Sequence, residues 1–135
     1  MVLSRGESTL PLISEDDILR VRHAVRDWMI EHQFSLTQQT KMVTAASELS
    51  RNTVIHGGGG MAILQQFQHS DGFGLKVTFE DQGPGIADIE QALSNGYTTG
   101  SGLGLGLGGS KRLVQDFQIH SQVGLGTKVS ISMWK

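Results

Sequence analysis

Two polar residues four positions apart, Glu48 and Asn52, are the first candidates for chemistry in this sequence. On a helix this spacing places both side chains on one face. Magnesium prefers oxygen ligands and typically takes one or two of them from protein, so Asn52 could supply a carbonyl oxygen to the metal. Glu48 could accept the proton of an attacking hydroxyl, or orient that hydroxyl, as a general base does. Taken alone, however, such a pair is more often a polar helix face held in water.

A second candidate is Asp81, which opens the segment Asp81-Gln82-Gly83-Pro84-Gly85-Ile86. Its carboxylate can accept a hydrogen bond from the exocyclic amine of adenine, whereas guanine carries a carbonyl at that position. Gly83 and Gly85 would let the backbone pass close to such a base, because glycine has no Cβ. The alternative is an ordinary Asp-x-Gly turn, which is common at strand ends.

The third candidate is a glycine-rich segment. Seven of the 18 glycines lie within the 14 residues from Gly96 to Gly109, and structureless loops of this length are usually functional. Glycines let backbone N–H groups approach an anion closely, and a helix beginning near Ser110 would direct its positive end at a phosphate. Leucines alternate with the glycines, whereas a solvated linker would carry serines. The pattern therefore predicts a phosphate lid, with a ligand-free surface loop as the alternative.

Two other glycine motifs do not fit this segment. The glycines from Gly104 to Gly109 match G-x-G-x-x-G, but no strand is predicted before them and no acidic residue follows Asp116, as the dinucleotide fingerprint requires. The P-loop pattern fails because Ser110 occupies its lysine position.

Length, charge and composition narrow the remaining classes. The chain has 135 residues, 11 basic against 13 acidic residues, and no cysteine, which excludes a disulfide framework, thiolate metal sites and a cysteine nucleophile. No apolar run approaches the roughly 18–20 residues of a membrane span, and the first residues do not resemble a signal peptide. We expect one domain over residues 1–135, a cytoplasmic location, and neither a nucleic-acid nor a membrane partner.

Hydrophobic periodicity predicts the elements that position the candidates. Apolar residues at helical spacing predict helices over residues 14–32 and 36–55, of which the second carries Glu48 and Asn52. Glycines 57–60 would end that helix. The other predicted elements are strands at 9–13, 61–68, 73–80, 118–123 and 127–134, and helices at 86–94 and 110–117. Their order indicates the α+β class, as a two-layer α/β sandwich with helices on one face of a mixed sheet.

Four motifs occur in one order along the chain: Glu48-Leu49-Ser50-Arg51-Asn52 with His56, then the Asp81 segment, the glycine-rich segment, and Gly124-Leu125-Gly126-Thr127. Together they resemble the N, G1 and G2 boxes and the terminal Gly-Thr of the GHKL (Bergerat-fold) ATPase/kinase superfamily, over about residues 10–134. The strings at 95–100 and 105–113 resemble the RsbT-type switch-protein serine/threonine kinases, which are anti-sigma regulatory factors of bacterial stress signalling.

This resemblance implies an ATP- and Mg²⁺-dependent protein serine/threonine kinase. Such kinases phosphorylate a STAS-domain antagonist and exchange partners with its phosphorylation state, and the freed kinase would activate a PP2C-type phosphatase regulator. The alternatives are an anti-sigma factor or nucleotide-gated protein-binding module with little kinase activity, and a degenerate nucleotide binder.

The resemblance also assigns the site residues. Glu48 would be the catalytic base, Asn52 the magnesium ligand, and Thr127 the threonine that supports the adenine site. Arg51, Lys111 and Arg112 are candidate phosphate contacts, although such residues are more often surface cations, and His56 is interpreted as a helix-end cap or a residue that supports the site, not as a metal ligand. The residues expected to bind the cofactors are Asn52, Asp81, Gly83, Gly85, Ile86, Thr98, Thr99, Gly100, Gly102, Leu103, Gly104, Leu105, Gly106 and Thr127.

Overall fold

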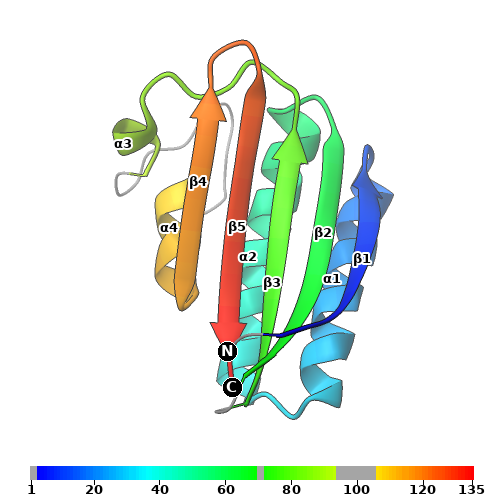
Figure 1. Cartoon of the computed structure of the whole chain (residues 1–135). Helices are drawn as coiled ribbons and strands as arrows, with labels where there is room; N and C mark the ends of the chain where they lie inside the picture. Colours follow the sequence, from blue (N-terminus) through cyan, green and yellow to red (C-terminus); the bar gives the residue numbers. More distant parts are fainter. Residues whose placement is uncertain (1–2, 70–71, 94–105) are drawn as a thin grey trace.

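The computed structural model describes residues 3–69, 72–93 and 106–135, which form five strands and four helices (Figure 1). In chain order these elements are β1 (Leu3–Leu12), α1 (Glu15–Glu31), α2 (Leu36–Ile55), β2 (Gly60–His69), β3 (Gly72–Asp81), α3 (Ile89–Ala92), α4 (Gly106–Leu113), β4 (Asp116–Gln122) and β5 (Gly126–Trp134). Within these ranges no helix is long and apolar enough to cross a bilayer.

The strands form one sheet in the order β1-β2-β3-β5-β4, and α1, α2 and α4 cover one of its faces (Figure 1). The predicted α+β class and two-layer sandwich are therefore confirmed. The prediction of a mixed sheet is wrong, because every pairing between the described strands is antiparallel. Strand β4 runs in the same direction as β3, but the chain turns back after β4 and inserts β5 between them.

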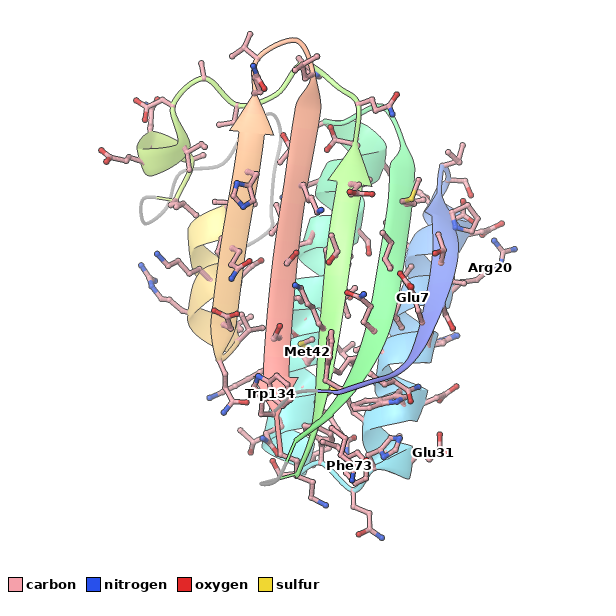
Figure 2. The ribbon with its side chains drawn as sticks, viewed as in Figure 1. Glu7, Arg20, Glu31, Met42, Phe73 and Trp134 are labelled. Atoms are coloured by element: carbon pink, nitrogen blue, oxygen red, sulfur yellow. The ribbon has the colours of Figure 1, made fainter. Side chains whose placement is uncertain are left out.

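Helix α2 occupies the centre of the helical layer. Ser35 caps its first turn by accepting a hydrogen bond from the N–H of Gln38 at 3.1 Å, which satisfies one of the unpaired donors of a helix start. Its apolar side packs on the sheet, and Met42 lies behind the strands with no exposed surface (Figure 2). The strand side chains in this core alternate along β3 and β5, as a half-buried strand requires; they are Leu75, Val77, Phe79, Val129, Ile131 and Met133.

The first turn of α1 is closed by Asp17. The N–H of Ile13 donates to Asp17 Oδ2 over 2.9 Å and holds the pKa of this carboxyl below its usual range. The N–H of Ser14 and the guanidinium of Arg20, which lies 2.6 Å from Oδ1, lower the pKa further, while burial of the carboxyl opposes them. The expected cap at Ser14 is thus completed by a carboxylate reaching back from the first turn.

Helix α4 differs from its prediction at both ends. It begins at Gly106 rather than near Ser110 and ends at Leu113, so that Phe117 belongs to β4. The sequence predicts a loop up to Gly109, and each glycine lowers helix stability by about 1 kcal/mol. The burial of Leu107 and Ser110 against the core explains the difference, since tertiary packing overrides such a weak local preference.

Candidate functional site

Helix α2 presents the predicted catalytic and metal-binding pair. Glu48 and Asn52 lie one turn apart, about 6 Å along the helix axis, and both are half-buried. Among the described residues, neither side chain has a hydrogen-bond or ion-pair partner. Two oxygen-bearing side chains are therefore positioned on one face of a rigid helix and remain available to a ligand.

A row of three polar residues crosses the neighbouring strands β3, β5 and β4 at one end of the sheet. The register pairs Asp81 of β3 with Thr127 of β5, and Thr127 with Ser121 of β4. Two-residue alternation places Asp81 on the same face as Val77 and Phe79, which point into the core below the helices. The row therefore lies on the helix-covered face, toward α2.

The carboxylate of Asp81 uses only one oxygen for the fold. Oδ1 accepts hydrogen bonds from the N–H of Gly83 at 2.9 Å and from the N–H of Thr127 at 3.2 Å. No described residue donates to Oδ2. The side chain is held in place by its neighbours and keeps one acceptor for a ligand.

The end of α2 packs directly on this carboxylate. A Cβ at Gly57 would lie 2.5 Å from Asp81 Oδ2, and a Cβ at Gly83 would lie 2.7 Å from the carbonyl oxygen of Gly57. Gly57 also donates its N–H to the carbonyl oxygen of Asn52 at 2.9 Å. The missing Cβ atoms thus connect the end of the Asn52 helix to Asp81, because any side chain at either glycine would separate them.

Ser121 and Thr127 share a small hydroxyl cluster with the turn after β3. Their hydroxyl oxygens lie 2.8 Å apart, and the N–H of Ile86 donates to Ser121 Oγ at 2.7 Å. Gly85, immediately before, has a φ of 80°, and a Cβ there would strike the carbonyl of Gln122. The turn is therefore anchored on β4 in a conformation that favours glycine.

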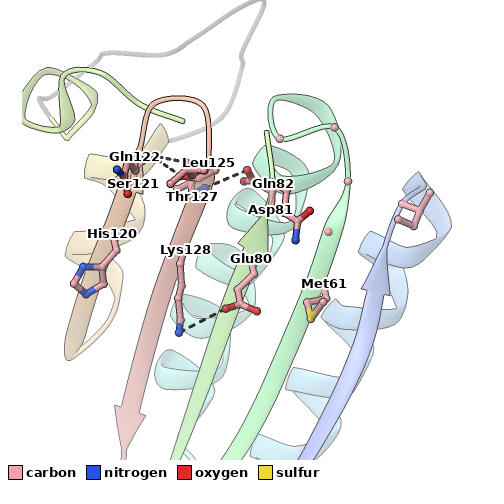
Figure 3. Close-up of a pocket in the computed structure, with 16 residues that line it drawn as sticks. Met61, Glu80, Asp81, Gln82, His120, Ser121, Gln122, Leu125, Thr127 and Lys128 are labelled. Atoms are coloured by element: carbon pink, nitrogen blue, oxygen red, sulfur yellow. Dashed lines mark hydrogen bonds and ion pairs between the residues drawn. The ribbon is translucent and has the colours of Figure 1, made fainter. Parts of the chain in front are cut away.

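A cavity of about 770 Å³ opens at these strand ends, beside the glycine turn 57–60 (Figure 3). Asp81, Ser121 and Thr127 line it. It also extends to the helix-free face, where Lys128 Nζ lies 3.5 Å from Glu80 Oε1. Its described lining does not include Glu48 or Asn52, so Gly57 is the point at which the helix of this predicted pair meets the cavity.

The other predicted site residues belong to the glycine-rich lid or are basic residues of α2 and α4. Most of the predicted lid lies outside the described residues, namely Thr98, Thr99, Gly100, Gly102, Leu103, Gly104 and Leu105. Gly106 is described and begins α4 with a φ of 69°.

The cations lie apart from that helix start. Lys111 and Arg112 are exposed in the last turn of α4, about 7–9 Å along the axis from Gly106. Arg51 is exposed on α2, and His56 is the C-cap residue of α2, as predicted.

Sequence reasoning missed the parts played by Gly57 and Ser121. Gly57 was interpreted only as a helix stop, although its φ is not in the left-handed region and its role is close approach. Ser121 stands two residues after Ile119 in the predicted strand, so alternation alone could have placed it on the helix-covered face. Nothing in the sequence shows that it meets Thr127 and Ile86.

Comparison with known proteins gives a family model and several similar sequences. A family model described as a histidine kinase-like ATPase domain matches residues 14–133. The serine/threonine-protein kinase RsbT of Bacillus subtilis (strain 168) is 38% identical over 128 residues, which cover 95% of this chain and 96% of that protein. An anti-sigma F factor of Heyndrickxia coagulans is 33% identical over 104 residues, which cover 72% of this chain and 70% of that protein.

Solved structures share the fold at low sequence identity. The RsbU and RsbW domains of a Mycobacterium tuberculosis protein match with a TM-score of 0.64 at 21% identity, over 99% of this chain but only 32% of that one. The SiaB–SiaC complex from Pseudomonas aeruginosa matches with a TM-score of 0.54 at 16% identity, over 96% of this chain and 89% of that one. These two similarities concern the arrangement of helices and strands alone.

Proposed function

The chain belongs to the family of histidine kinase-like ATPase domains, and we propose that it is an ATP- and Mg²⁺-dependent protein serine/threonine kinase. The observation that carries the proposal is the contact between the two halves of the site. Gly57 joins the helix of Glu48 and Asn52 to the free acceptor of Asp81. The adenine base at Asp81 and the phosphates near α2 could then be bound by two parts of the fold that are packed directly on each other.

The strand row fits the adenine of ATP. Asp81 Oδ2 is an acceptor without a described partner, and the exocyclic amine of adenine is a donor. A Cβ at Gly57, Gly83 or Gly126 would clash with a neighbouring segment, so these three glycines let the end of α2, the turn after β3 and the start of β5 pack closely around Asp81. Close packing at these glycines holds the Asp81 carboxylate in one position at the wall of the cavity.

The α2 pair fits Mg²⁺ bound together with a nucleotide. The described residues contain no group of three or more His, Cys, Asp or Glu side chains that could hold a metal by themselves. Magnesium typically takes one or two protein oxygens and completes its shell with phosphate and water, which matches the carbonyl oxygen of Asn52 beside Glu48. When bound, the ion supplies neutralisation of the phosphate charge.

In the proposed reaction Glu48 accepts the proton of a serine or threonine hydroxyl on the partner protein. The hydroxyl oxygen forms a bond to the γ-phosphorus, the bond from that phosphorus to the β–γ bridging oxygen breaks, and ADP leaves. Positioning and charge neutralisation account for most of the rate in phosphoryl transfer. The protein must therefore hold Glu48, Asn52 and Asp81 in fixed relation, as the contact at Gly57 does.

The proposed substrate is a STAS-domain protein, and the proposed role is a partner switch in bacterial stress or sigma-factor signalling. A PP2C-type phosphatase regulator would bind the kinase once the STAS partner is phosphorylated. The similarity to anti-sigma F factors favours a second candidate, a nucleotide-gated module that binds a sigma factor. Pull-down with sigma factors against STAS and phosphatase proteins separates the two.

The test is transfer of labelled phosphate from γ-labelled ATP to purified STAS-domain proteins encoded beside this gene. Glu48→Gln keeps the size of the side chain and removes the base, so transfer should fall about 10²- to 10⁴-fold while ADP still binds. Glu31→Gln, which makes the same change at an exposed position of α1, is the matched control and should transfer at the wild-type rate. Transfer by Glu48→Gln at the wild-type rate would remove Glu48 from the mechanism.

A chain that binds ADP but phosphorylates none of these proteins would contradict the kinase proposal. That result would favour the nucleotide-gated binding module. A chain that does not bind ADP would contradict both candidates.

A further inference from the structure

The hydroxyl cluster beside Asp81 has a determinate hydrogen-bonding pattern. Ser121 Oγ has three neighbours within hydrogen-bond distance: the N–H of Ile86 at 2.7 Å, the carbonyl oxygen of Gly126 at 3.2 Å and Thr127 Oγ1 at 2.8 Å. An amide N–H can only donate and a carbonyl oxygen can only accept, whereas a hydroxyl can do both. The directions of these bonds can therefore be counted.

Ser121 has a single hydroxyl hydrogen and two acceptor sites. The N–H of Ile86 takes one acceptor site, and in the contact with Gly126 only Ser121 can be the donor, because a carbonyl oxygen accepts. The contact to Thr127 then forms only if the Thr127 hydroxyl donates to the second acceptor site of Ser121. Any other arrangement leaves one of the three contacts without a hydrogen bond.

We propose that Ser121 is a positioning residue that makes the Thr127 hydroxyl an acceptor toward the nucleotide base. The inference rests on the proposed ATP-binding function and adds a source of base selectivity to it. The hydrogen of Thr127 is committed to Ser121, so only its lone pairs remain for a ligand. Thr127 therefore presents the same hydrogen-bonding character as the free oxygen of its cross-strand partner Asp81.

Two adjacent acceptors select the ligand by chemistry. A purine nucleotide with an amino group at position 6 offers two hydrogens there, whereas one with a carbonyl at position 6 brings a third acceptor to that position and offers only the hydrogen on N1 beside it. A site built of hydrogen-bonding groups discriminates strongly against a ligand that leaves those groups unpaired. With Ser121 in place, the hydroxyl of Thr127 cannot turn to donate to the carbonyl.

The test compares ADP with inosine diphosphate, which carries a carbonyl at position 6 and a hydrogen on N1, by isothermal titration calorimetry. The wild-type protein should bind ADP more tightly. Ser121→Ala releases the Thr127 hydrogen, which can then donate to the 6-carbonyl, so the ratio of the two affinities should fall about 2- to 10-fold, the effect of one hydrogen bond. Ser121→Thr keeps a hydroxyl and should restore the wild-type ratio.

Thr127→Val removes the hydroxyl on which Ser121 acts. In this background Ser121→Ala should change the affinity ratio no further, because the two side chains act as one unit. Ser130→Ala is the matched control, since it breaks another serine–threonine hydroxyl bond, 3.0 Å to Thr78, on the opposite face of the same strand. It should leave the ratio unchanged.

The affinity ratio also separates positioning from a structural role. If Ser121→Ala only loosened the turn at Ile86, both affinities would fall together and the ratio would stay at the wild-type value, which would overturn the inference. Should Ser121→Ala fail to fold, Thr127→Val alone decides, and an unchanged ratio in that variant overturns the inference. A wild-type protein that binds no ADP would instead contradict the proposed function.

Discussion

Replacing Asp81 with asparagine changes a single acceptor atom in the proposed base site. An amide can keep its carbonyl oxygen at Oδ1, where the N–H groups of Gly83 and Thr127 donate at 2.9 and 3.2 Å. The opposite orientation would set an NH₂ group against two donors, so it is disfavoured. The NH₂ group of Asp81→Asn therefore replaces Oδ2, and the free acceptor becomes a donor while the fold keeps both of its hydrogen bonds.

The size of the effect follows from the hydrogen bond that is lost. A hydrogen bond to a charged group contributes about 1.5–3 kcal/mol, and about 1.4 kcal/mol corresponds to a tenfold change in affinity. The affinity for ADP should therefore fall about 10- to 150-fold in Asp81→Asn. Inosine diphosphate should lose much less affinity, because the new NH₂ group can donate to its 6-carbonyl. The free energy of unfolding should change little.

Calorimetric titration of both nucleotides, with thermal unfolding measured in parallel, checks this prediction. Glu80→Gln is the matched control, because it removes the same charge one residue away, on the opposite face of β3. Its ion pair with Lys128 is partly exposed, and such pairs contribute little. Wild-type ADP affinity in Asp81→Asn, or an equal loss in Glu80→Gln, would refute the assignment of Asp81 as the acceptor for the base.

Three further predictions concern the packing of the helices. Gly57→Ala would place a Cβ 2.5 Å from Asp81 Oδ2, so denaturant unfolding should show a loss of about 1–3 kcal/mol and calorimetry at least a tenfold loss of ADP affinity. Gly58→Asn is its control, since a Cβ there would meet nothing within 4 Å and asparagine tolerates the φ of 75°. Wild-type affinity in both variants would contradict the close-approach role. Ser50→Ala should raise the free energy of unfolding by about 1 kcal/mol, because the buried Ser50 Oγ has no described partner. Ser47→Ala, whose hydroxyl donates to Val43, should give no such gain, and an equal gain in both variants would count against this explanation. Asp17→Asn should destabilise the protein at neutral pH. Folding lowers the pKa of Asp17, so the stabilisation that the Asp17 carboxylate gives the wild-type protein is complete above about pH 4 and disappears as pH falls through the folded pKa. The difference from wild type in pH-dependent unfolding should therefore shrink in acid, and a constant difference would refute the contribution of the charge.

Features that depend on neighbouring residues could be predicted from the sequence. The bounds of α2 agree with the predicted range 36–55, because the serine cap, the apolar spacing and the terminal glycines are all local signals. The same spacing placed Glu48 and Asn52 on one helix face before any packing was known. The turn at Asp81 was also predicted correctly at the end of a strand, since Asp-x-Gly and Gly-Pro-Gly sequences have strong local preferences.

Other features depend on residues that are distant in sequence. The order of the strands places β5, and not β4, beside β3. The register of that pairing, which depends on which apolar faces are buried below the helices, brings Thr127 to Asp81, 46 positions away. The early start of α4 follows from the burial of Leu107, which outweighs the helix propensity of its glycines.

The sequence by itself therefore predicted which side chains could carry the chemistry and determined which local elements hold them. Only the tertiary structure decided that Gly57 rests on Asp81 and that Ser121 meets Thr127 and Ile86. The physical reason is that helix periods and turn preferences act over a few residues. Close packing and strand register are instead set by the whole core at once.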